Sequence, residues 1–341
     1  MTGVVAVGAG PLQPLLDDPS VTDVLINGAD AVWVDRGGGL VRTAVRFRDD
    51  DAVRALAVRW AATAGRRLDA AAPFVDAQLP GGVRLHAALA PIAGPGTCVS
   101  LRVHRRGGHP LSAFCSDGAV REVLSACVRA RLAFVVSGGT GTGKTTLLDA
   151  LLGHIDPRER VVLVEDAGEL APALPHVVRL SARPPNIEGA GGIDLRQLVR
   201  EALRMRPDRI VVGEVRGAEV ADLLLALNTG HDGGATTVHA NGAHEIPARL
   251  EALGGLAGLS RSALHSQMAA ALDVVIHLAR APERHVAAVA VLERAADGLV
   301  AAVPALRLTS GGWERAPASR VLAERVHLRG IAVPAALGPL A

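Results

Sequence analysis

Only one of the 36 Lys and Arg residues in this chain is a lysine, and it lies within a glycine-rich segment. That segment follows the pattern Gly-x4-Gly-Lys-Thr of a phosphate-binding loop, or P-loop. It consists of Gly138, Gly139, Thr140, Gly141, Thr142, Gly143, Lys144, Thr145 and Thr146. A compact ammonium fits beside the terminal phosphates of a nucleotide in so tight a loop, whereas a planar guanidinium is too bulky. The sequence therefore predicts that ATP binds here, with Lys144 on the phosphates and Thr145 on Mg²⁺.

The segments on either side of this loop predict a strand before it and a helix after it. Residues 131–137 are mostly apolar and predict the strand, and residues 144–152 predict the helix. A loop in that position directs backbone N–H groups and the positive end of the helix dipole at bound phosphates. A glycine-rich surface loop that matches by chance is the alternative, and the strand, the spacing and the helix together argue against it.

Polar residues end three further predicted strands of this half of the chain. Strand 160–165 runs into Glu165 and Asp166, strand 209–213 into Glu214, and strand 235–239 ends on His239. In a P-loop enzyme one acidic residue holds Mg²⁺ through water, and another orients or deprotonates the attacking water. A lone acid at such a junction is more often a helix cap or a surface charge. Beside a P-loop, the set predicts a site for ATP hydrolysis.

Composition limits the classes of function. The 341 residues leave room for two domains, and a formal charge of +2 gives no strong electrostatic attraction to DNA or to a membrane surface. Four Phe, three Trp and no Tyr leave few rings for stacking on single-stranded nucleic acid. No convincing signal peptide opens the chain, and no uncharged apolar run reaches the roughly 18 residues of a membrane span. A cytoplasmic protein is expected.

The domain organisation changes near residue 106. We expect a small α+β domain over residues 1–106, a linker over 107–112, and an α/β domain with a mostly parallel sheet over 113–341. The first domain is predicted to contain β-type runs and one helix, at residues 21–26, 31–35, 40–47, 50–64 (the helix), 83–89 and 97–103. The second adds helices at 195–205 and 218–228, and a C-terminal hairpin from runs 286–292 and 299–306.

Several segments together resemble one family. Residues 203–217 read LRMRPDRIVVGEVRG, and NTGHDG and TTVHAN follow at 228–233 and 236–241. These segments are similar to the secretion ATPases of type II and type IV systems. Within them, RPPNIEG at 183–189 is typical of the branch that drives tight-adherence (Flp) pilus assembly and of related conjugation ATPases. DVLING at 23–28 and VWVD at 32–35 match the N-terminal domain of that branch, and the similarity spans roughly residues 12 to 305.

The resemblance implies a role for each matched residue. Lys144 and Thr145 correspond to the Walker A ligands of phosphate and Mg²⁺. Glu165 and Asp166 lie in the family's Asp box and hold Mg²⁺, in part through water, with Glu165 also among the catalytic residues. The remaining expected catalytic residues are Glu214 as general base, His239 as the sensor of the γ-phosphate, and Arg84 and Arg102 as nucleotide-reaching arginines of the N-terminal domain.

The resemblance also implies an assembly and a location. Members of the family form hexameric rings, with the nucleotide between a PAS-like N-terminal domain and a RecA-like ATPase domain. They work at the cytoplasmic face of the membrane with inner-membrane platform proteins of a pilus or secretion system. An arginine carried by a moving domain would couple hydrolysis to motion.

Three functions remain open at this level. The first is a ring-forming ATPase that powers pilus assembly or protein secretion. A nucleic-acid motor or conjugation ATPase acting on DNA is the second, although the near-neutral charge and scarce aromatic residues argue against it. A nucleotide-gated scaffold is the third, and Glu214 argues against it. The motifs do not distinguish extension, retraction and secretion.

Overall fold

The chain separates by its internal contacts into two compact units, in the main residues 1–107 (unit 1) and residues 108–341 (unit 2). The computed structural model describes residues 8–94, 96–103, 109–183, 185, 190–280 and 283–339. Residues 107 and 108 of the predicted linker 107–112 therefore lie outside the described residues. Pro184 and residues 186–189 of the RPPNIEG segment lie outside them as well. No helix in the described parts of the chain is long and apolar enough to cross a membrane.

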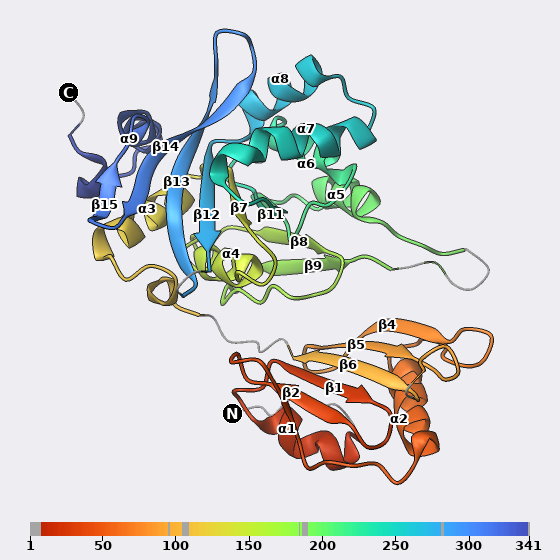
Figure 1. Ribbon diagram of the computed structural model, residues 1–341. Coiled ribbons are helices and arrows are strands. Elements are labelled where there is room, and N and C mark those ends of the chain that lie inside the picture. The colour runs from red at the N-terminus through yellow and green to blue at the C-terminus, as the bar shows by residue number, and fades with distance from the viewer. Residues whose placement is uncertain are drawn as a thin grey trace. The chain divides into compact units, whose positions relative to one another are not determined.

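Unit 1 is an antiparallel sheet of six described strands, in the order β3-β2-β1-β6-β5-β4, covered by the helix α2 (Figure 1). Its strands are β1 (Asp23–Asn27), β2 (Val32–Asp35), β3 (Leu40–Arg42), β4 (Phe74–Leu79), β5 (Val83–Ala88) and β6 (Cys98–Val103). Its helices are η1 (Gly10–Leu12), α1 (Gln13–Asp17) and α2 (Asp50–Thr63). Buried and exposed residues alternate along β5 and β6, as expected for a sheet with one packed face.

Helix α2 begins where the sequence provides a cap. The Asp49 carboxylate accepts a hydrogen bond from the Ala52 N–H at 2.8 Å, which satisfies one of the open amides of the first turn. Val53, Leu56 and Trp60, spaced for one helical face, are buried against the sheet.

Unit 2 has one sheet of nine described strands, in the order β15-β14-β13-β12-β7-β11-β10-β8-β9. The strands from β12 to β9 are parallel, and β13, β14 and β15 extend the sheet as antiparallel strands. The strands are β7 (Phe134–Gly138), β8 (Val161–Glu165), β9 (Val177–Ser181), β10 (Arg209–Val212), β11 (Ala235–His239), β12 (Val274–Ala279), β13 (His285–Arg294), β14 (Val300–Thr309) and β15 (Gly312–Arg315).

Helices cover both faces of this sheet. They are η2 (Leu111–Ala113), α3 (Gly118–Arg129), α4 (Lys144–Leu152), α5 (Leu195–Leu203), α6 (Glu219–Leu227), η3 (Ala243–Glu245), α7 (Ile246–Leu256), α8 (Arg261–Ala271), α9 (Ser319–Leu328) and η4 (Ala335–Leu337). One apolar core joins the sheet to α3, α4 and α9, and a second joins its other face to α5, α6, α7 and α8. On β7, Phe134 and Val136 belong to the first core and Val135 to the second. This burial on both faces explains why the parallel strands read as continuous apolar runs.

The predicted fold class is confirmed: a mostly parallel α/β unit follows a smaller α+β unit. The C-terminal hairpin is present as β13 and β14. Two predicted strand limits are wrong. Arg131 has φ of 54°, a left-handed conformation in the turn after α3, so the strand begins only at Phe134. The run 40–47 forms a strand over Leu40–Arg42 alone.

A buried ion pair joins the amino-terminal ends of neighbouring parallel strands. The guanidinium of Arg209 is fully buried at the start of β10 and donates to both carboxylate oxygens of Glu159, at 2.8 and 2.9 Å. It also donates to the Gly233 carbonyl at 3.3 Å. Glu159 precedes β8 and Gly233 precedes β11, so one side chain ties three strands together at the edge opposite the P-loop.

Replacing Arg209 with leucine is expected to lower the free energy of unfolding by about 3 kcal/mol, because it removes one partner of a buried pair. Urea unfolding followed by circular dichroism measures this change. Arg158→Ala is the matched control: its ion pair with Asp156 is exposed, and its loss should leave the free energy of unfolding nearly unchanged. Equal effects of the two variants would contradict the assigned role of Arg209.

Candidate functional site

The P-loop lies at the carboxyl end of β7, the edge where ligands bind in open α/β sheets. All five residues of β7 are buried, and α4 begins at Lys144 directly after the loop. Gly141 and Gly143 have φ of 70° and 94°, a left-handed backbone that glycine adopts without strain. A side chain on Gly138 would collide with the Thr142 hydroxyl at 2.7 Å and with the Leu278 carbonyl at 2.8 Å. The loop conformation therefore depends on these glycines.

The Lys144 ammonium is buried without a carboxylate partner. Its residue is 9% exposed, and Nζ donates to the Gly139 carbonyl at 2.9 Å. Among the described residues, no carboxylate oxygen lies within 4.0 Å of it. Burial lowers the pKa of this ammonium, while the nearby charge of Glu214 acts in the opposite direction. A buried cation bonded to only one neutral acceptor fits an anionic ligand such as a phosphate.

Two histidines bond the loop and the end of β7 to the neighbouring strands. The Thr140 hydroxyl and His239 Nε2 are 2.6 Å apart, so the residue that ends β11 contacts the P-loop directly. On the other side of β7, the Ser137 hydroxyl lies 2.9 Å from His277 Nδ1 on β12. Sequence reasoning did not identify His277, because the strand that carries it was not recognised as a neighbour of β7.

Glu214 lies in a segment held by backbone contacts. The Gly213 carbonyl accepts from the Thr237 hydroxyl at 2.8 Å, and the Val215 N–H donates to the Thr237 carbonyl at 3.0 Å. The Glu214 carboxylate, with a side chain 24% exposed, forms an ion pair with Arg216. Its charge acts on Lys144 and favours the protonated form of the lysine, which raises the lysine pKa.

Glu219 holds the same segment and was missed by sequence reasoning. One carboxylate oxygen of this buried residue accepts from the N–H groups of Arg216 and Gly217, at 2.6 and 2.8 Å. Gly217 leaves room for it, since a Cβ there would lie 3.0 Å from the other carboxylate oxygen. A carboxylate at the first position of α6, just after a Gly-containing loop, was the available signal.

Glu165 and Asp166 differ in their surroundings although they are adjacent. Glu165 is 3% exposed, and one carboxylate oxygen accepts from the Leu170 N–H at 2.9 Å. It packs against Gly213, where a Cβ would lie 3.1 Å from its Cγ. Asp166 is exposed. Their strand β8 is separated from β7 by β11 and β10, so they lie farther along the sheet edge from the P-loop than Glu214 does.

The chain's own residues suit a magnesium ion held largely by phosphate and water. In the described parts of the chain, no group of three or more His, Cys, Asp and Glu side chains gathers as a metal cage. Mg²⁺ commonly takes one or two protein ligands and completes its shell with phosphate and water. Thr145, for which the sequence predicts this role, is the second residue of α4 and directly follows Lys144.

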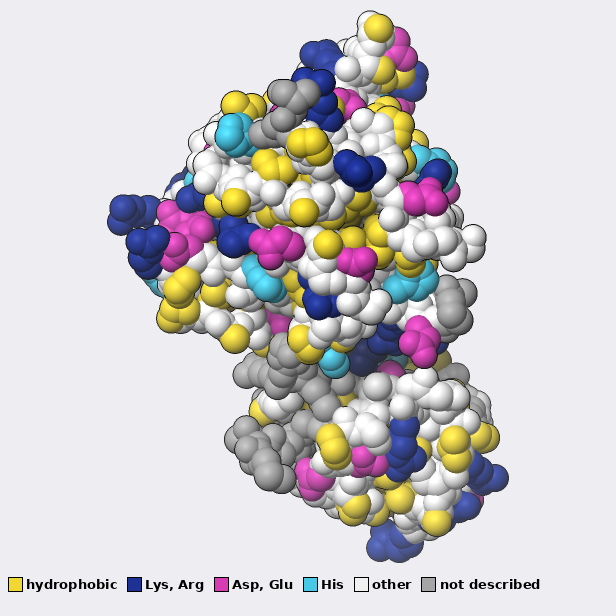
Figure 2. Space-filling view, turned by 90° about the vertical axis from the view of Figure 1, so that its left-hand side faces the viewer, with side chains coloured by type: hydrophobic (Ala, Val, Ile, Leu, Met, Phe, Trp, Pro, Cys, Tyr) yellow, Lys and Arg dark blue, Asp and Glu magenta, His cyan; other side chains and the backbone are white. Residues whose placement is uncertain are grey.

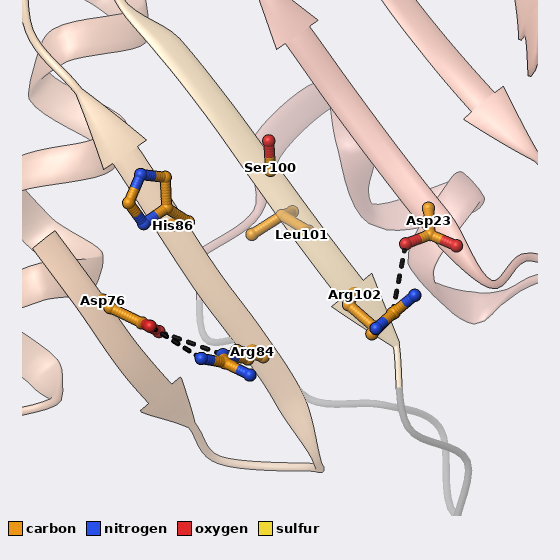
Figure 3. A pocket seen from close by; sticks show the side chains of 7 residues that line it. All are labelled: Asp23, Asp76, Arg84, His86, Ser100, Leu101 and Arg102. Carbon is orange, nitrogen blue, oxygen red and sulfur yellow. Dashed lines mark hydrogen bonds and ion pairs between the residues drawn. The ribbon is translucent and has the colours of Figure 1, made fainter. Parts of the chain in front are cut away.

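The two arginines predicted in unit 1 lie side by side on one sheet face (Figure 3). Arg84 and Arg102 are paired across β5 and β6, an arrangement that is unfavourable for like charges unless anions neutralise it. Arg84 makes two hydrogen bonds to Asp76, at 3.1 and 2.7 Å, and Arg102 lies 3.5 Å from Asp23. The Arg84 guanidinium lowers the pKa of Asp76. All four line a pocket of about 290 Å³ with His86, Ser100 and Leu101.

The structure thus brings part of the predicted site together. Lys144, Thr140 and His239 meet at the P-loop, and Glu214 approaches Lys144. Glu165 and Asp166 lie farther along the same edge, and Arg84 and Arg102 belong to unit 1.

A model of the family described as type II/IV secretion system protein matches residues 5–305 of this chain. The chain belongs to that family. The resemblance seen in the sequence is confirmed at this level.

Relatives within the type II/IV secretion family are named for transfer and secretion. The chain is 59% identical over 308 residues to the "Putative conjugal transfer protein Rv3659c" of Mycobacterium tuberculosis, which covers 87% of both chains. It is 32% identical over 275 residues to the conjugal transfer protein TrbB of Rhizobium radiobacter, covering 78% and 81%. It is also 34% identical over 266 residues to the type IV secretion system protein PtlH of Bordetella pertussis, covering 70% and 78%.

Solved structures share the fold of this family member. The pilus retraction motor PilT with bound ADP aligns with a TM-score of 0.58 and 18% identity, covering 91% of this chain and 82% of PilT. The ATPase DotB of Legionella pneumophila aligns with a TM-score of 0.55 and 20% identity, covering 84% and 76%. The predicted RecA-like fold is thereby confirmed.

Replacing Glu219 with alanine is expected to speed hydrogen exchange at the Arg216 and Gly217 amides about tenfold, because each amide loses its acceptor. Exchange measured by mass spectrometry on peptides spanning 214–217 tests this. Glu219→Gln keeps a carbonyl acceptor and should leave exchange near the wild-type rate. Unchanged exchange in Glu219→Ala would contradict the assigned role of this carboxylate.

Proposed function

We propose that this chain is an ATP-hydrolysing ring motor that powers pilus assembly or type II/IV protein secretion. The observation that carries the proposal is the buried Lys144 ammonium at the end of β7, which among the described residues has one backbone acceptor and no carboxylate partner. ATP is the expected ligand because the loop combines this cation with left-handed glycines and the start of α4. Family membership supports the same conclusion.

In this proposal the P-loop amides and Lys144 hold the phosphates, and Thr145 holds Mg²⁺. Glu165 and Asp166 act on the metal through water, which agrees with their distance along the sheet edge from β7. When bound, Mg²⁺ neutralises charge that develops on the transferring phosphoryl group. The P-loop amides and Lys144 orient that phosphoryl group for attack.

Glu214 is the proposed general base. Its carboxylate is partly exposed and can reach a water molecule once its ion pair with Arg216 opens. His239 is proposed to sense the γ-phosphate, because its bond to the Thr140 hydroxyl connects β11 to the loop that holds the nucleotide. A phosphate that binds the Thr140 hydroxyl or the His239 ring would change the hydrogen bond between them.

Coupling to movement is proposed to depend on unit 1. Arg84 and Arg102 pair with Asp76 and Asp23 on their own sheet, and they would have to exchange these carboxylates for phosphate. An arginine that arrives only when a domain closes stabilises phosphoryl charge only in that state. ATP turnover would thus be coupled to interdomain motion.

The proposed assembly is a homo-hexamer at the cytoplasmic face of the membrane. Its expected partners are inner-membrane platform proteins of a pilus or secretion system, of the Flp type by resemblance. A relative named for a type IV secretion system supports the proposal of partners from a secretion system.

A second candidate is a conjugation motor that acts on DNA. The names of two relatives favour it. Figure 2 shows Lys and Arg side chains interspersed with Asp and Glu over the viewed face, an arrangement unlike a basic nucleic-acid stripe. Salt-sensitive DNA binding that stimulates turnover would favour this candidate over secretion. A nucleotide-gated scaffold is the third possibility, and the Glu214 experiment below distinguishes it.

Lys144→Ala is expected to reduce ATP turnover at least about a hundredfold, because the phosphate charge loses its buried cation. Lys144→Arg should fail as well, since it keeps the charge but not the compact shape. Phosphate release is measured over a range of protein concentrations, with oligomer mass recorded on the same samples. Specific activity should rise as rings form. Wild-type turnover in folded Lys144→Ala would refute the proposal.

Glu214→Gln should abolish turnover while nucleotide binding persists, because the amide cannot accept the proton of the attacking water. Calorimetric titration with ATP measures binding, and phosphate release measures turnover. If both stay at the wild-type level, Glu214 is not the base. If the wild-type ring itself binds ATP without turnover, the scaffold function is favoured instead.

A further inference from the structure

Strand β12 brings a second chain segment to the P-loop. It runs parallel to β7 as its direct neighbour (Figure 1). Leu278 is in register with Gly138. The contact is close, because a Cβ on Gly138 would lie 2.8 Å from the Leu278 carbonyl oxygen. Parallel neighbours end at the same edge of a sheet, so residues just after β12 must lie beside the phosphate-binding loop.

Two arginines flank this end of the sheet, Arg280 just after β12 and Arg284 just before β13. Arg280 Nη1 lies 3.4 Å from the position that a Cβ on Gly141 would occupy. Arg284 Cδ and Nη1 lie 3.7 and 4.0 Å from the corresponding position on Gly143. Both arginine side chains therefore lie beside the two left-handed glycines of the loop.

Neither arginine is neutralised within the described residues. Both are exposed, and no described carboxylate lies within 4.0 Å of either guanidinium. The arginines of unit 1 differ, because Arg84 and Arg102 each have an aspartate partner. Together with Lys144, this gives three cations around one loop whose amides also favour an anion. Such a concentration of positive charge is unfavourable until a multiply charged anion binds.

We propose that Arg280 and Arg284, which lie after β12 and before β13, bind the β-phosphate of the nucleotide held by the P-loop, in addition to Lys144. The inference rests on the proposed function and adds two arginines to the side chains that bind the nucleotide. The loop cradles the α- and β-phosphates, and both arginines lie beside its glycines, so the β-phosphate is their expected contact. Nucleoside di- and triphosphates are the ligands that this arrangement recognises.

The test is calorimetric titration of the full chain with ADP and Mg²⁺. Arg280→Ala and Arg284→Ala should each weaken ADP binding about tenfold, as the loss of a charge-assisted hydrogen bond predicts. The salt dependence of the affinity should also decrease. Arg280→Lys and Arg284→Lys should recover part of the affinity. Arg307→Ala is the matched control, since Arg307 is also exposed but lies within β14, and this variant should bind ADP as the wild type does.

Each outcome decides one question. If the wild type and Arg307→Ala bind ADP while Arg280→Ala and Arg284→Ala match them, this inference is wrong and the proposed function stands. If the wild type binds neither ADP nor ATP, and Lys144→Ala changes nothing, the proposed function fails and the inference fails with it. Thermal unfolding of the ligand-free variants checks for a structural role. A weaker affinity accompanied by a lower unfolding midpoint would count against phosphate binding.

Discussion

The structure of this family member is arranged around one buried cation. Lys144 lies at the junction of β7 and α4, 9% exposed, and its ammonium donates to the Gly139 carbonyl. Desolvation disfavours this charge, as the lowered pKa indicates, and Glu214 only partly offsets that effect. The flanking glycines, the fully buried β7 and the two helical layers keep the group in place. An anionic ligand is the group that resolves this electrostatic imbalance.

The arginines that pair with carboxylates fall into two classes. Arg209 is buried with Glu159 and joins three strands at the edge away from the ligand, so its role is to fix the sheet. Arg84, Arg102 and Arg216 pair with carboxylates at partly exposed positions. Exposed ion pairs contribute little stability, which makes them easy to exchange for a phosphate. Both classes use arginine, so residue type does not distinguish them. The burial of each arginine and the carboxylate with which it pairs do.

Local sequence predicted most of the elements that support the site. Helix Lys144–Leu152 and strand Ala235–His239 have the predicted limits, because a glycine loop and an apolar run define them directly. Strands β4, β9 and β12 were not predicted. β9 carries a half-buried, mixed pattern, and β12 follows α8 almost without a turn residue, so periodicity gave no clear boundary. Arg131 was assigned to a strand, although its left-handed backbone makes a turn there.

The sequence by itself determined the chemistry at the P-loop, because spacing of Gly and Lys along one segment fixes which groups face a phosphate. Tertiary structure alone decided which other residues join it. His277, Arg280 and Arg284 come near the loop only because β12, distant in the chain, pairs with β7. Glu219 differs, because its contacts with the N–H groups of Arg216 and Gly217 are local and lie directly before α6. Strand order is set by burial over the whole sheet, a property that no single segment contains.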